Sequence, residues 1–131
     1  MSEELGKNGV ISYREFLTMD TLEMILYLES LRRIPDFPEI NAENAGDAAR
    51  ELRRLSGNYS FLTSLSGYAR AMKRKLKADP AKKDMYGEMI DKEAIIAEAM
   101  KATDLTYRAL NKSLTIYSDS ISELRMTGSM I

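Results

Sequence analysis

The sequence has 131 residues, and none of them is a cysteine or a histidine. These two absences exclude disulfide bonds, zinc sites of the cysteine–histidine type and thiol nucleophiles. They also exclude the side chain that most often acts as a general base near neutral pH. Absence of cysteine is typical of a reducing compartment such as the cytoplasm. We therefore expect a cytoplasmic, non-catalytic protein that carries no cofactor.

Long apolar runs are also missing. The most apolar stretch, Leu22 to Leu28, contains Glu23 and is much shorter than the roughly 20 residues that cross a bilayer. The first nine residues are polar and acidic, which does not match a secretory signal. We expect no membrane partner. Since 44% of the residues are apolar, the chain can bury one core, and we expect a single domain over residues 1–131.

Charge is strongly segregated along the chain, although the net charge is only −1. Residues 1–49 carry a balance of −6, residues 50–83 a balance of +8 and residues 84–131 a balance of −3. Such polarisation offers a basic surface to an anionic partner, while the acidic parts limit nonspecific association.

The N-terminal third predicts a leader, one helix and a loop. Residues 1–12 read as a loosely attached leader. Ser12 with Glu15, and Asp20 with Glu23, stand at the spacing of helix capping boxes before an apolar run. We expect a helix over residues 13–33, with a break near Asp20 as an alternative. The two prolines of the loop at 34–41 end it, because proline disfavours helix at the preceding residue.

A second helix is expected over residues 42–76, with Asn41 or Asn44 as its cap. Its apolar residues follow steps of three and four, close to a coiled-coil seam: Ala48, Leu52, Leu55, Tyr59, Leu62, Leu65, Ala69, Met72 and Leu76. Gly57 and Gly67 each disfavour helix by about 1 kcal/mol relative to alanine. The apolar rhythm crosses both glycines, so we expect one continuous helix, with a kink as the alternative.

A third helix is expected over residues 80–126, after a turn at 77–79 in which Asp79 caps and Pro80 occupies the first helical position. Its seam alternates steps of four and three: Ile96, Met100, Thr103, Tyr107, Leu110, Leu114, Tyr117, Ile121 and Leu124. At 1.5 Å per residue this helix is about 70 Å long. Residues 127–131 read as a helix stop and a frayed end.

These elements predict an all-α fold in which two long amphipathic helices form an antiparallel hairpin beside a shorter N-terminal helix. The short helix cannot cover both long helices. The remaining apolar surface therefore predicts a homo-oligomeric helical bundle, a coiled-coil type of assembly held by the two seams.

The strongest local signal is a basic cluster where the second helix turns into the third. Among residues 70–83, seven of fourteen are cationic and one is anionic. The cations are Arg70, Lys73, Arg74, Lys75, Lys77, Lys82 and Lys83, and Tyr68 and Tyr86 flank them. Such charge density binds phosphate backbones, and exposed tyrosines stack on bases. The alternative is a solvated helix end, where cations are favoured by the helix dipole.

Two further charged groups have structural interpretations. Arg50, Arg53 and Arg54 extend the basic stripe, but pairing with Glu23 and Glu29 of the first helix is the favoured interpretation. The carboxylates Glu88, Asp91, Glu93, Glu98 and Asp104 lie mostly off the seam and have no histidine to join them in a helical metal site. We interpret them as a solvated face, with Glu88 and Lys92 as an ordinary surface pair. No metal site is predicted.

The layout of residues 52–126 resembles the small recombination mediators of tailed phages, the UvsY type. The resemblance covers a helix with a Lys/Arg-rich end, a turn and a final helix. Near the end it includes Lys112-Ser113, Ile116, Ile121 and Glu123-Leu124-Arg125. Proteins of that type are helical oligomers that bind single-stranded DNA and help to load a recombinase. The resemblance implies the same partners here, inside a bacterial host cell. The acidic residues 1–49 have no counterpart in that family.

Three functions remain open. The first is a non-catalytic oligomer that binds single-stranded DNA or another polyanion through the basic cluster, as an accessory of recombination or replication. The second is a protein-binding adaptor or inhibitor, for example a phage-encoded blocker of a host nuclease of the anti-CRISPR kind. The third is a structural helical subunit of a larger assembly. Salt-dependent binding of single-stranded DNA separates the first from the other two.

Overall fold

The structure is a computed structural model that describes residues 12–130, with side chains described as far as Arg125. Its elements are α2 (Tyr13–Thr18), α3 (Thr21–Arg32), α4 (Ala45–Lys77), the 3₁₀ turn η1 (Pro80–Lys82) and α5 (Lys83–Met130), and no strand occurs among the described residues. The predicted all-α fold with a long hairpin is confirmed. The predicted leader lies outside the described residues except for Ser12, which caps α2.

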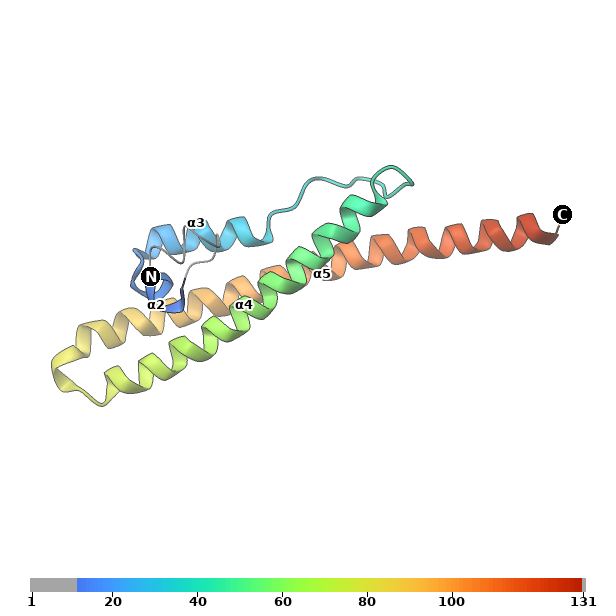
Figure 1. Ribbon diagram of the computed structural model, residues 1–131. Coiled ribbons are helices and arrows are strands. Elements are labelled where there is room, and N and C mark those ends of the chain that lie inside the picture. Colours follow the sequence, from blue (N-terminus) through green and yellow to red (C-terminus); the bar gives the residue numbers. More distant parts are fainter. Residues whose placement is uncertain (1–11, 131) are drawn as a thin grey trace.

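Helices α4 and α5 form the antiparallel hairpin and run beside each other along most of α4 (Figure 1). The predicted seams supply most of the side chains between them. Residues of both seams are buried, among them Leu55, Leu62, Leu65, Ile96 and Leu110. Helix α4 is continuous through both internal glycines, as the unbroken apolar rhythm predicted.

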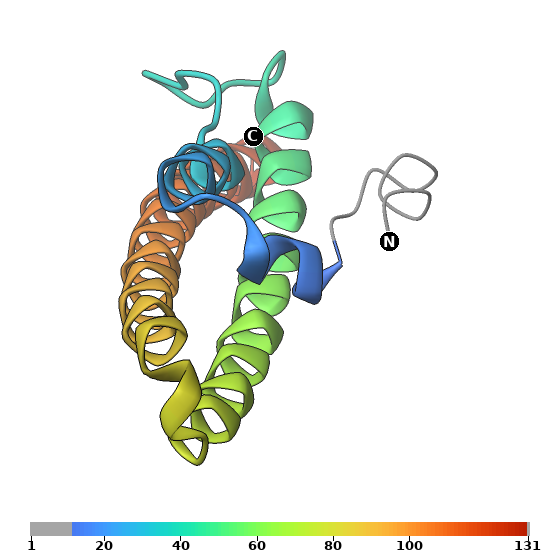
Figure 2. The same cartoon turned by 90° about the vertical axis from the view of Figure 1, so that its left-hand side faces the viewer.

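The N-terminal residues form two helices, because the chain is extended at Met19. The Ser12 hydroxyl accepts a hydrogen bond from the Glu15 N–H at 3.2 Å, and the Asp20 carboxylate accepts one from the Leu22 N–H at 3.2 Å. Each predicted cap therefore starts its own helix. Figure 2 shows the short α2 crossing the hairpin, while α3 packs mainly along α5.

Phe16 of α2 is fully buried in the larger core cluster of the hairpin. Its ring packs edge-on against Tyr27 of α3, with centroids 5.4 Å apart, and against Phe61 of α4, with centroids 6.1 Å apart. Burial in this cluster raises the pKa of the Tyr27 hydroxyl above its ordinary value. These contacts join the two short helices to the long hairpin.

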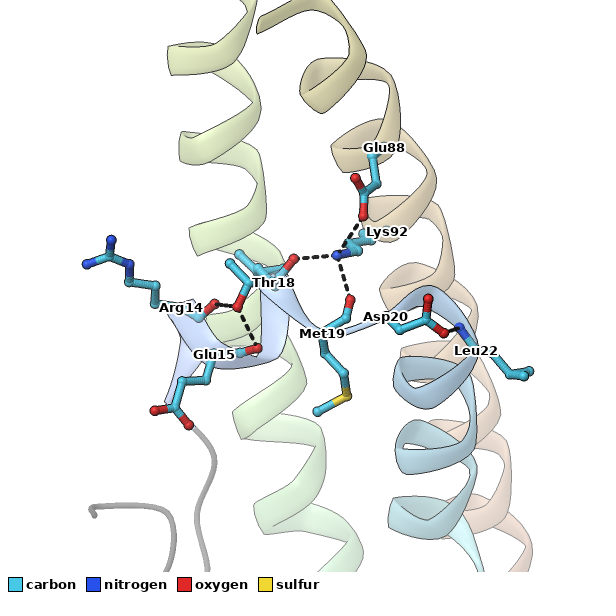
Figure 3. A network of polar contacts seen from close by, with 9 residues as sticks. Arg14, Glu15, Thr18, Met19, Asp20, Leu22, Glu88 and Lys92 are labelled. Carbon is cyan, nitrogen blue, oxygen red and sulfur yellow. Dashed lines mark hydrogen bonds and ion pairs between the residues drawn. The ribbon is translucent and has the colours of Figure 1, made fainter. Parts of the chain in front are cut away.

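Cations of the hairpin bind the carboxyl ends of both short helices. The Lys92 ammonium of α5 donates to the carbonyl oxygens of Leu17 and Met19 at the end of α2 (Figure 3). The Arg54 guanidinium of α4 donates to the carbonyl oxygens of Leu31 and Arg33 at the end of α3. The last carbonyls of a helix lack partners within the helix and carry partial negative charge, so these cations hold α2 and α3 in place.

Helix α5 is much longer than α4, and its C-terminal part extends beyond the end of the hairpin (Figure 1). Leu110 packs with Ala48 near the start of α4, and Leu114 borders that cluster. We call residues 115–130 the overhang. The helix continues to Met130, so the predicted helix stop at residue 127 was wrong. None of the described helices combines the length and the apolar character needed to cross a membrane.

Candidate nucleic-acid interface at the hairpin tip

The predicted basic cluster lies at the closed end of the hairpin, and we call residues 70–83 the tip. The turn at the tip is short and is held by hydrogen bonds. The Ala78 N–H donates to the Arg74 carbonyl at 3.3 Å, and the Asp79 carboxylate accepts from the Ala81 N–H at 3.0 Å. Pro80 begins η1, as the sequence predicted. Because this turn is tight, cations from α4, η1 and α5 come together at one end of the molecule.

Six of the seven predicted cations are exposed, all except Lys73, and five of these six lie around the turn: Arg74, Lys75, Lys77, Lys82 and Lys83. None of these five makes an ion pair with another described residue. Two carboxylates, Asp79 and Asp84, are close to these cations in the sequence. The Asp79 side chain caps η1. Excess positive charge is therefore available at the tip for an external anion.

The other two predicted cations, Arg70 and Lys73, turn toward α5. The Lys73 ammonium lies 2.7 Å from Glu93 Oε2, and the Arg70 guanidinium lies 3.9 Å from Glu93 Oε1. Glu93 Oε2 is buried and has no aligned hydrogen bond among the described residues, so the Lys73 contact is an ion pair by distance alone. Glu93 thus neutralises part of this charge. The Lys73 side chain is 30% exposed and belongs mainly to the hairpin, whereas the Arg70 side chain is 57% exposed and remains accessible to a ligand.

The two flanking tyrosines differ in their accessibility. Tyr68 is 36% exposed, and its ring centroid lies 5.7 Å from that of Tyr13 in α2. Tyr86 is half-buried and packs against the larger core cluster. Tyr68 therefore keeps part of its surface for a ligand, whereas Tyr86 contributes mainly to the core.

The arginines near the start of α4 do not form the ion pairs that the sequence predicted. Arg50 pairs with Asp47 at 3.3 Å, and Arg54 pairs with Glu51 at 2.7 Å. Both partners belong to α4 itself, and the contacts of Arg54 with α3 are with backbone carbonyls. The predicted pairing with Glu23 and Glu29 was wrong, because the loop between the helices places the end of α3, and not its carboxylates, beside Arg54.

The acidic residues of α5 mostly pair along their own helix. Glu98 lies 3.7 Å from Lys101, and Asp104 lies 3.0 Å from Arg108. Glu88 pairs with Lys92 at 3.1 Å, but Lys92 is only 2% exposed, so this pair differs from the surface pair that the sequence predicted. Within the part of the chain that the structure describes, no group of three or more carboxylates is placed to bind a metal ion.

Comparison of the chain with protein families, with curated proteins and with solved structures gives no match.

Proposed function

We propose that the chain is a non-catalytic protein that binds single-stranded nucleic acid through the hairpin tip and works as a homo-oligomer. One observation carries the proposal. Five exposed cations without an ion-pair partner among the described residues share one end of the molecule. A helix C-terminus favours cations, but that effect falls off within the last turn. It does not account for Lys82 and Lys83, which follow the turn.

The shape of the tip favours a single strand over a duplex. The cations lie on three consecutive segments around a convex turn, not along one helix face that could enter a groove. A flexible strand follows such a surface, and each phosphate that it places on a cation releases counterions. Affinity then depends on charge density and on salt, with little dependence on base sequence.

The overhang supports the homo-oligomer. The same seam that packs α5 against α4 continues past α4, where Tyr117 and Ile121 are half-buried and Leu124 is 68% exposed. The uncharged residues Ser113, Ser118 and Ser120 flank this stripe, whereas Lys112, Asp119 and Glu123 lie on the opposite side of the helix. Arg125 follows Ile121 by four residues and is the charged residue beside the stripe among residues 113–125. Along most of its length the stripe of one copy therefore offers apolar side chains to that of another.

The resemblance to recombination mediators of the UvsY type agrees with this proposal. It implies that the oligomer coats a single strand and assists a recombinase or replication protein on it. The tip would then hold the strand, and the acidic α3 side of the hairpin would remain away from the phosphates.

One observation favours a second candidate, a protein-binding adaptor or inhibitor. An open groove of about 440 Å³ between α3 and α5 is lined mainly by apolar side chains, including Ile25, Leu28 and Ile95. Leu22 and Leu26, on the same helix α3, are 63% and 57% exposed. Apolar surface of this kind suits a helix or loop of another protein.

Salt-dependent binding tests the proposed function. For a single-stranded oligonucleotide, log affinity should fall linearly with log salt, by about 0.7 per phosphate contact. The double variant Arg74→Ala/Lys77→Ala should make the slope shallower by about one to two units. The matched control Lys101→Ala/Lys112→Ala removes the same charge from exposed positions of α5 away from the tip and should leave the slope unchanged.

If the two double variants show the same dependence of log affinity on log salt, the tip is not the nucleic-acid interface. Absence of binding to single- or double-stranded DNA and RNA at low salt would refute the nucleic-acid proposal and leave the adaptor function.

A further inference from the structure

A pocket lies beside the tip, where α2 crosses the hairpin. Its volume is about 370 Å³, and residues of α2, α4 and α5 line it. Three methionines contribute, namely Met72, Met85 and Met89, together with Tyr68 and Leu76. The sequence did not indicate this pocket, because the crossing of α2 over the hairpin brings together residues that are far apart in the chain.

The lining suits a flat, polarisable ring. Methionine side chains are flexible and make favourable contacts with aromatic faces, and a partly exposed tyrosine offers a stacking surface. Small-molecule sites usually occupy about 300–1,000 Å³ and combine apolar walls with a few polar groups. The pocket therefore has the size and surface to take one aromatic heterocycle.

The polar residues of the pocket are Glu88 and Lys92 of α5, together with Arg14 and Thr18 of α2. Figure 3 shows the Glu88–Lys92 ion pair. The Lys92 ammonium donates hydrogen bonds to the Leu17 and Met19 carbonyls and forms an ion pair with Glu88 Oε1 at 3.1 Å. The Glu88 side chain is 56% exposed, so its carboxylate can accept further hydrogen bonds from a ligand. Amino and imino groups at the edge of a nucleobase supply such donors.

The pocket adjoins the charged surface of the tip. Lys75 follows Tyr68 by seven residues on α4, which places both on the same face of the helix. Lys82, the last residue of η1, precedes Met85 of α5 by three residues. An occupant that reaches the pocket therefore has cations beside it, and a nucleotide combines an aromatic ring with an anionic phosphate. A purely apolar peptide side chain would leave these cations without a counterpart.

From this arrangement we infer that the pocket receives one unstacked base of a single strand whose phosphates bind the tip. The inference rests on the proposed function and deepens it, because it supplies a reason for preference of a single strand over a duplex. Paired and stacked bases of a duplex cannot enter the pocket, whereas a base of a single strand turns into it at little cost.

A pair of matched variants tests the inference. Met85 is 53% exposed at the pocket and Ile90 is 42% exposed on the same helix, outside the pocket lining. Met85→Glu and Ile90→Glu add the same charge at exposed positions. We expect Met85→Glu to weaken binding of a 20-nucleotide single-stranded DNA by about tenfold more than Ile90→Glu, which corresponds to about 1.4 kcal/mol. The two variants should bind the corresponding duplex equally.

Photocrosslinking of the unaltered protein gives an independent measurement. A single strand that contains 5-iododeoxyuridine should form adducts in the peptides that carry Tyr68, Met85 or Met89, identified by mass spectrometry. Equal single-strand affinities of the two variants, or adducts confined to other peptides, overturn the pocket inference. In those cases a changed salt slope of Arg74→Ala/Lys77→Ala still supports the tip as the interface. If the unaltered protein binds no nucleic acid, both proposals fall.

Discussion

The contacts of Lys92 lead to a quantitative prediction for the variant Lys92→Met. The Lys92 side chain is 2% exposed and its ammonium donates to the backbone oxygens of Leu17 and Met19, the latter at 2.8 Å. Methionine retains most of the aliphatic stem, so packing changes little. It removes both hydrogen bonds and leaves the carboxyl end of α2 without a donor.

The expected loss of stability follows from these contacts. A hydrogen bond from a charged donor contributes about 1.5–3 kcal/mol, whereas removal of the charge also removes the desolvation cost of a buried ammonium. We therefore expect a net destabilisation of about 2–4 kcal/mol. For a chain of this size, each 1 kcal/mol corresponds to a Tm shift of about 3–5 °C, which gives a decrease of roughly 10 °C.

Thermal unfolding followed by circular dichroism measures this effect, and hydrogen exchange shows whether α2 loses protection before the hairpin does. Lys101→Met is the matched control. Lys101 lies on the same helix, is 75% exposed and, among the described residues, pairs with Glu98 alone, at 3.7 Å. Its replacement should therefore change stability by less than about 0.5 kcal/mol. If Lys92→Met and Lys101→Met unfold at the same temperature, with equal protection of α2, Lys92 does not hold α2 on the hairpin.

Two other predictions concern α4 and the overhang. Gly57→Ala and Gly67→Ala should each stabilise the protein by about 0.5–1 kcal/mol, measured by urea unfolding, because an added Cβ meets nothing within 4 Å at either position. Destabilisation by either substitution would show that another molecule packs against these glycines. Ile121→Glu should lower the mass measured by sedimentation while circular dichroism stays unchanged, because neither core cluster of the described residues includes a residue of the overhang. An unaltered mass would exclude the overhang as the oligomer interface.

The long helices could be predicted from the sequence because their signals are local. The seams of α4 and α5 follow the helical period, and burial in the hairpin selects that period. The turn was predicted for the same reason, since Asp79 and Pro80 act on their immediate neighbours. Ser12 and Asp20 each cap a helix, and two capping signals so close together indicate two short helices. The single helix preferred for residues 13–33 was therefore wrong, and the alternative with a break near Asp20 was correct.

The partners of Lys92 and Arg54 could not be predicted in this way. Lys92 binds oxygens 73 and 75 residues away in the sequence, and Arg54 binds oxygens 21 and 23 residues away. These oxygens belong to the backbone, so no residue type marks them. One signal was present. The seam extended one step back from Ile96 reaches Glu93, and a charge at a seam position indicates a partner across the hairpin, which is Lys73.

The same reasoning explains why the site was only partly predictable. Counting cations identified the tip, but the pairing of Arg70 and Lys73 with Glu93 depends on the register of α4 against α5. The position of Tyr86 in the core depends on that register as well. The pocket beside the tip depends in addition on where α2 crosses the hairpin, which is set by the contacts of Phe16 and Lys92.

In the proposed function, the position of the tip and the overhang at opposite ends of α5 connects oligomerisation with binding. The helix has 48 residues, which corresponds to about 70 Å, so a second copy on the overhang leaves the tip open. Five cations on one tip predict weak binding at physiological salt, in the range of about 10⁻⁴–10⁻⁶ M for nonspecific contacts. Several tips on one strand raise the affinity by about 10²–10⁴ when the strand reaches them all. Ile121→Glu should therefore weaken binding of a long single strand but not of an oligonucleotide that spans one tip. Equal losses on both lengths would show that the overhang and the tip do not act together.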